Sequence, residues 1–162
     1  MLVVSDRLPY PVVGVPRQAE IGARFDTLLA RLTKRFSEVQ YFGSYRVVDA
    51  VTWARARNGK PIRMFTYADG EVYANEGAQT PEEAELGFVD LTGLSLQAAC
   101  DKLFQVAEEE HAKPSSERRP RAFLDESDVI DLARAWSVDP TDLSDQPAGV
   151  RLAARLPPSL QS

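Results

Sequence analysis

The chain has 162 residues, 44% of them hydrophobic, and a formal net charge of −5 at pH 7. A chain of this length suits one domain, which buries roughly 70% of its unfolded surface and needs no disulfide or metal to fold. Its single cysteine and single histidine exclude an internal disulfide and leave few soft metal ligands, so we expect no metal and no cofactor. It starts without the pattern of a signal peptide and no stretch approaches the roughly 18 apolar residues of a membrane span, which predicts a cytoplasmic protein.

The charges are unevenly distributed along the chain. Residues 1–60 carry ten Lys or Arg and five Asp or Glu, whereas residues 61–162 carry nine and nineteen. Between 69 and 110 there are eleven acidic residues and a single base, Lys102. Such a segment repels the phosphates of nucleic acids and attracts basic partners. The other interpretation is a face that is merely solvated, as most acidic runs are.

The N-terminal part predicts one extended segment and one helix. The apolar run at 2–4 indicates a short strand at a sheet edge, and Pro9 and Pro11 hold the residues that follow extended. A helix at 17–36 is predicted from apolar residues at helical spacing, Ile21, Phe25, Leu28, Leu29, Leu32 and Phe36. We expect this stripe to pack on a sheet and not on a membrane.

The segment 38–77 predicts three antiparallel strands joined by two tight turns. Asn58-Gly59 and Asp69-Gly70 tolerate the positive φ angles of a type I′ turn, and both lie between runs rich in Val, Tyr, Phe, Trp and Thr. With two-residue loops, the predicted opposite pairs are Arg57 and Lys60, Arg55 and Ile62, Trp53 and Met64, Tyr67 and Val72, and Phe65 and Ala74.

Both faces of this meander are expected to be apolar, because side chains alternate along each strand. One face would carry Val47, Asp49, Val51, Trp53, Ile62, Met64 and Tyr73. The other would carry Val48, Ala50, Thr52, Ala54, Phe65, Tyr67, Val72 and Ala74. Neither face can be left in water, so helices or irregular segments should cover both. The predicted fold class is α+β, an antiparallel meander with helices packed on it.

Three further helices are predicted after the meander. Thr80, Pro81 and the glutamates that follow have the form of a helix start, and Gly87 ends that helix early. A longer helix at 95–110 has an apolar face made of Leu96, Ala99, Cys100, Leu103, Phe104 and Ala107. A last helix at 125–136, capped by Asp125, has an inner face made of Val129, Leu132, Ala133 and Trp136.

The domain organisation follows from composition. Residues 1–143 are expected to form a single domain. Within it, 111–122 is predicted to be a flexible linker, because it contains two prolines and hardly any apolar residue. Its His111 is interpreted as a surface imidazole. Residues 144–162 are expected to be a partly disordered tail.

Motifs that indicate catalysis or nucleic-acid binding are missing. The chain contains neither GxxxxGK[ST] nor GxGxxG, and the position of the sole histidine disfavours a Ser-His-Asp site. Cys100 falls within an apolar stripe and is interpreted as a core residue rather than a catalytic thiol. The segment 128–143 resembles the first half of a helix-turn-helix, but the residues that follow are acidic, which excludes DNA binding.

Two groups of charged residues in the meander could carry a function. Asp49, which lies between Val48 and Ala50, forms either a structural ion pair with Arg46 or another arginine, or a ligand pocket on the meander with Tyr45, Arg46 and Trp53. A cluster of cations at the hairpin tip, Arg55, Arg57, Lys60 and Arg63, could meet a phosphate or an acidic partner. We favour pairing of these cations with the acidic segment 69–110 of the same molecule.

Three sequence blocks resemble a family of bacterial hypothetical proteins that is common in actinobacteria. The blocks are 39–48 (VQYFGSYRVV), 75–88 with NEG and TPEEAELGF, and 128–140, which ends in WSVDP. The resemblance spans about residues 2–140 and implies no activity, although some members resemble small immunity-type proteins that accompany secreted toxins. Family members usually have His at the position of Tyr45 and a further N-terminal section, so this chain looks like a shortened version, with a sheet edge open to pairing.

The function predicted is a non-enzymatic protein-binding module, of immunity type, whose acidic surface neutralises a basic protein partner. Its contact residues would include Glu76, Glu82, Glu83 and Glu85. No nucleic acid or membrane is expected as a partner. One alternative is a small-ligand-binding or enzymatic domain with a pocket at Tyr45, Arg46, Asp49 and Trp53. Another is a degenerate, truncated paralogue without a role of its own.

Overall fold

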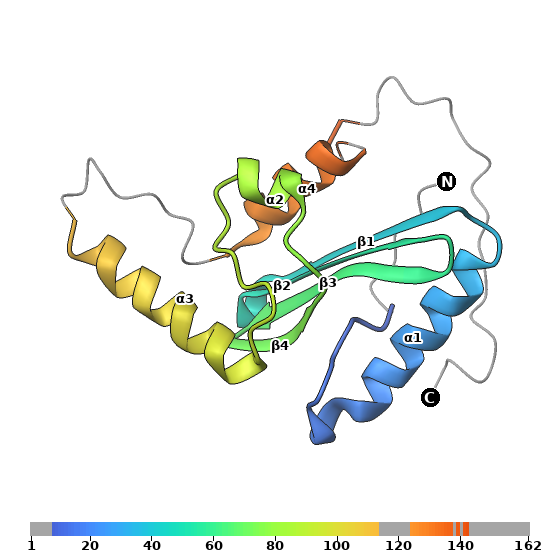
Figure 1. Ribbon diagram of the computed structural model, residues 1–162, viewed down its shortest axis with the longest axis horizontal. Coiled ribbons are helices and arrows are strands. Elements are labelled where there is room, and N and C mark those ends of the chain that lie inside the picture. The colour runs from blue at the N-terminus through green and yellow to red at the C-terminus, as the bar shows by residue number, and fades with distance from the viewer. Residues whose placement is uncertain (1–7, 114–123, 138, 140, 143–162) are drawn as a thin grey trace.

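The computed structural model describes residues 8–113, 124–137, 139, 141 and 142. Four strands form one antiparallel sheet in chain order: β1 Glu38–Tyr45, β2 Ala50–Arg57, β3 Lys60–Ala68 and β4 Glu71–Glu76. The helices are α1 Ala19–Thr33, α2 Pro81–Glu85, α3 Leu96–His111 and α4 Glu126–Trp136, with short 3₁₀ turns η1 Pro16–Gln18 and η2 Arg46–Val48. The chain is a single α+β domain, as the sequence predicts (Figure 1).

The sheet has four strands instead of the predicted three. The first predicted strand is broken by η2 and by Asp49, whose φ of 44° lies in the left-handed region. The chain therefore reverses between β1 and β2, and Tyr45 pairs with Ala50. Aspartate tolerates this conformation better than most residues, yet without an adjacent glycine the turn carries no strong sequence signal.

The two predicted turns are confirmed, but the register between the strands is only partly as expected. Asn58-Gly59 and Asp69-Gly70 have φ angles of 51° and 80°, and of 50° and 82°. The pairs next to the turns, Arg57 with Lys60 and Tyr67 with Val72, are as predicted. Farther from the turns, Arg55 faces Arg63, Trp53 faces Phe65 and Phe65 faces Asn75. Irregularities after Arg55 and after Thr66 each add one residue to a strand, which shifts every later pair.

This shift places Phe65, Tyr67 and Val72 on the face of Trp53 and Met64 on the other face, the reverse of the prediction. The first face is covered by α2, α3, α4 and the 86–94 segment, and its buried strand residues are Val51, Trp53, Phe65, Tyr67 and Val72. On the second face, Phe25 and Leu29 of α1 pack on Ala54, Ala56 and Met64. Figure 1 shows α2 and α4 together on one side of the sheet and α1 on the other. Both faces are thus covered, as expected.

The segment before α1 is held against the second face. The backbone N–H of Val13 donates to the carbonyl of Tyr73 in β4 at 2.8 Å, and the Thr66 hydroxyl donates to the carbonyl of Pro11 at 2.7 Å. A Cβ on Gly22 of α1 would lie 2.4 Å from the Val12 carbonyl oxygen, so only glycine permits this approach. The predicted strand at 2–4, residues 114–123 of the linker and the tail from 144 lie outside the described residues.

Candidate functional site

Two hollows open at the end of the sheet where the β3–β4 turn lies. The first, which we call the Phe104 hollow, has a volume of about 300 Å³ and is lined by Tyr67, Gly70, Leu103, Phe104, Ala107, Glu108 and His111. The second, the Arg46 hollow, measures about 360 Å³ and is lined by Ser44, Arg46, Asp49, Ala50, Val51, Asp125, Glu126 and Ser127. The hollows are neighbours, because Val51 of one and Tyr67 of the other face each other on β2 and β3.

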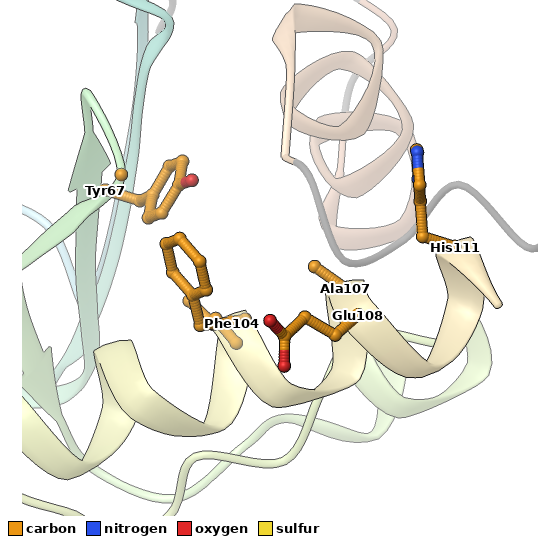
Figure 2. A pocket seen from close by; sticks show the side chains of 7 residues that line it. Tyr67, Phe104, Ala107, Glu108 and His111 are labelled. Carbon is orange, nitrogen blue, oxygen red and sulfur yellow. The ribbon is translucent and has the colours of Figure 1, made fainter.

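The Phe104 hollow lies between α3 and the end of β3. Ser95 caps α3, its hydroxyl accepting the N–H of Ala98 at 3.2 Å, and the Cys100 thiol accepts the N–H of Val72 at 3.1 Å, which holds the helix beside β4. Figure 2 shows the ring of Tyr67 next to that of Phe104, with Glu108 and His111 farther along the same helix.

Phe104 does not lie in the core, contrary to the sequence prediction. Its side chain is 64% exposed, whereas Ala99, Leu103 and Ala107 are buried. The buried residues recur every four positions, so the helix turns only that narrow stripe toward the sheet, and Phe104 lies at its border. The predicted apolar face of α3 is therefore wider than the face that the sheet can cover.

Tyr67 gives the Phe104 hollow a polar group. Burial raises the pKa of its phenol, and the neighbouring Cys100, Asp49 and Asp69 raise it further. The residue is only 8% exposed, and its hydroxyl has no hydrogen-bond partner among the described residues. The Tyr67 hydroxyl, which has no partner among the described residues, can therefore form a hydrogen bond with a ligand that enters the hollow.

The predicted ligand residues are only partly brought together by the fold. Arg46 and Asp49 line the Arg46 hollow, whereas Tyr45 is 61% exposed outside it and Trp53 is buried in the core. Asp49 is exposed and so is not the buried acid expected, and Arg46 pairs with Glu126 instead of Asp49. Hydrogen bonds from Arg46 and Ser44 hold the pKa of Glu126 below its ordinary value.

The residues of α4 that complete this hollow were missed from the sequence. Asp125 caps the helix and accepts the N–H groups of Ser127 and Asp128, as the predicted helix start requires. That local pattern indicates where the helix begins. It does not indicate that the helix start faces β1, some 80 residues earlier in the chain.

The predicted partner-binding glutamates have different environments. Glu83 is 1% exposed and binds Trp53, Arg63 and the N–H of Thr80, so it cannot contact a partner. The helix start predicted at Thr80 is confirmed, and it includes a capping box that directs Glu83 inward. Glu82 is half-buried and binds Arg55, while Glu76 and Glu85 are exposed.

Two of the four hairpin cations bind the acidic segment of the same molecule, as favoured from the sequence, whereas Lys60 forms no ion pair with a described residue. Arg63 binds Glu83 and Arg55 binds Glu82, both within the acidic segment. Arg55 and Arg57 also bind Glu38, which lies outside that segment.

Most acids of the segment 69–110 are nevertheless exposed and have no ion-pair partner among the described residues. None of its eight exposed acids forms an ion pair with a base in the described part of the chain: Asp69, Glu71, Glu76, Glu85, Asp90, Asp101, Glu108 and Glu109. Within the same residues, no three His, Cys, Asp or Glu are grouped to hold a metal ion, and no helix is long and apolar enough to cross a membrane.

In comparisons with known proteins, no family model, curated protein or solved structure matches the chain.

Proposed function

We propose that the protein is a non-enzymatic protein-binding module, of immunity type, whose acidic surface binds a basic protein partner. The observation that carries the proposal is the set of eight exposed carboxylates in 69–110 without a described cationic partner. If these acids served only to neutralise the protein's own arginines, they would form ion pairs with them, as Glu82 and Glu83 do.

Unpaired carboxylates of one sign favour association with a positively charged surface. They accelerate encounter and suppress binding of acidic proteins, and both effects weaken as salt screens the charges. A basic partner should therefore dissociate at high ionic strength.

Charge reversal tests the proposal on exposed positions. Tagged protein is used to capture partners from a lysate of its own source at low and high salt, with mass spectrometric identification. Glu76→Lys/Glu85→Lys is expected to lose a stoichiometric basic partner that the wild type retains at low salt. The matched control, Glu20→Lys/Asp26→Lys, changes the net charge equally on the helix that covers the opposite face and should retain it. Equal retention by both variants would refute the proposal.

A small-ligand site in the Arg46 hollow is the second candidate. It is favoured by Arg46 and Asp49 lining one hollow together with Ser44 and Ser127, at a volume within the range of ligand pockets. A ligand at a hundredfold excess over its Kd would add about 2.7 kcal/mol to the stability of the fold. A metabolite panel that shifts the Tm of the wild type but not of Arg46→Ala would support this site, and a panel without any shift would count against it.

A further inference from the structure

We propose that the Phe104 hollow receives one aromatic side chain of the basic partner, from a segment in which Lys or Arg flanks that side chain. This inference rests on the proposed function and specifies where the partner is anchored. The expected occupant is a segment of a partner protein.

The apolar lining suits an aromatic ring. Tyr67, Leu103, Phe104 and Ala107 form most of the wall, and Phe104 leaves 64% of its side chain in water. Exposed aromatic residues beside a hollow are the typical anchors of protein interfaces, because one inserted ring removes much apolar surface from water at little entropic cost. A ring entering here would stack against both Phe104 and Tyr67.

The Tyr67 hydroxyl supplies a directional contact. It lacks a hydrogen-bond partner in the described part of the chain, and its oxygen remains accessible to solvent although most of the residue is buried. A backbone carbonyl or amide next to the inserted side chain could pair with it. A segment of polypeptide brings such groups at every residue, which favours a peptide over a purely apolar ligand.

The charges around the hollow favour cations beside the ring. Glu108 lines it, Asp69 adjoins its Gly70, and Asp49 lies close enough to act on Tyr67. The negative end of the α3 dipole adds to this potential. Lys102 lies two residues before Phe104, so it points to another side of the helix.

Short peptides test the inference directly. Labelled peptides with the core Lys-Lys-Trp-Lys-Lys, Lys-Lys-Ser-Lys-Lys or Ser-Ser-Trp-Ser-Ser, flanked by glycine, are titrated with the full chain at low salt and followed by fluorescence anisotropy. The first should bind about tenfold more tightly than either of the others, because only it offers both the ring and the cations.

Matched variants assign the binding to the hollow. Phe104→Ala should raise the Kd about tenfold, whereas Phe36→Ala, which truncates another exposed phenylalanine beyond α1, should leave it unchanged. Glu108→Gln should raise the Kd about threefold and Glu109→Gln, on the same helix but outside the hollow, should not. Tyr67→Phe keeps the ring and should raise the Kd about fivefold through the lost hydrogen bond.

The possible outcomes separate this inference from the proposed function. If the serine-centred basic peptide binds as tightly as the tryptophan peptide and Phe104→Ala has no effect, the acidic surface binds cations without an anchor and the inference is wrong. If no peptide binds, the inference is also wrong, while the lysate experiment still decides the proposed function. If tryptamine binds as tightly as the tryptophan peptide, the occupant is a small aromatic amine and the proposed partner segment is wrong. A last variant is Arg118→Ser/Arg119→Ser/Arg121→Ser. If it binds the tryptophan peptide tenfold more tightly than the wild type, basic residues of the chain itself compete for the hollow, and the proposed partner segment is wrong.

Discussion

Glu83 and Arg63 form a buried ion pair in which Oε1 and Nε lie 2.9 Å apart and the side chains are 1% and 3% exposed. The same carboxylate accepts hydrogen bonds from the Trp53 indole at 2.8 Å and from the N–H of Thr80 at 2.7 Å. One side chain therefore joins β2, β3 and the start of α2. Arg63 extends the network to the side-chain oxygen of Asn75, whose amide binds the carbonyls of Leu91 and Leu94.

Removal of the Glu83 carboxylate should strongly destabilise the fold. Glu83→Ala leaves the Arg63 charge and the Trp53 N–H buried without their acceptor, which we expect to lower the free energy of unfolding by about 3–5 kcal/mol. Urea denaturation followed by circular dichroism measures the change. Glu85→Gln, on the exposed side of the same helix, should change it by less than about 0.5 kcal/mol. A loss at Glu83 no larger than this control would show that the network does not stabilise the protein.

Gly22→Ala should destabilise α1 against the usual trend. Alanine in a helix interior is ordinarily more favourable than glycine by about 1 kcal/mol. Here the added methyl group would lie 2.4 Å from the Val12 carbonyl oxygen, so the segment before the helix must move. We expect a net loss of about 1–3 kcal/mol in thermal or urea unfolding. A stabilised variant would mean that the segment shifts freely and does not hold α1.

The Glu38 carboxylate should make stability depend on pH. Hydrogen bonds from Gln40, Arg57 and Arg55 lower its pKa from 4.5 to about 2 in the folded protein. A carboxylate with a lowered pKa stabilises the fold above the unfolded value of 4.5, and this contribution is lost as the pH falls toward 2. Because the group is partly exposed, Glu38→Gln should cost only about 1 kcal/mol at pH 7.

The pH series provides its own control. The difference in unfolding free energy between wild type and Glu38→Gln should shrink between pH 4.5 and pH 2. A difference that stays constant over this range would indicate that the glutamine disturbs packing instead of removing a charge.

Substitution of Asp49 should separate its conformational role from a ligand role. Its φ of 44° suits Asn or Gly, whereas a β-branched residue is strained there. Asp49→Asn should leave the Tm nearly unchanged, and Asp49→Val should cost about 1–2 kcal/mol. If a ligand of the Arg46 hollow is found, its loss in the stable Asp49→Asn variant would give the carboxylate a binding role, and its retention would leave Asp49 as a turn residue.

Features that depend on neighbouring residues could be predicted from the sequence. The turns at Asn58-Gly59 and Asp69-Gly70, and the caps at Thr80 and Asp125, follow from backbone preferences and hydrogen bonds that span four residues or fewer. The helix periodicities likewise placed α1, α3 and α4 within a few residues of their bounds.

Which side chains meet depends on residues far apart in the chain and becomes clear only from the folded protein. The strand irregularity after Arg55 places Phe65 on the face of Trp53, and Glu83 is buried in an ion pair with Arg63 instead of lying on the acidic surface. The Phe104 hollow forms only because α3 turns a narrow stripe toward the sheet and leaves Phe104 beside Tyr67, 37 positions earlier. No local pattern encodes that arrangement, since the free energy of packing is set by the whole set of elements that share the core.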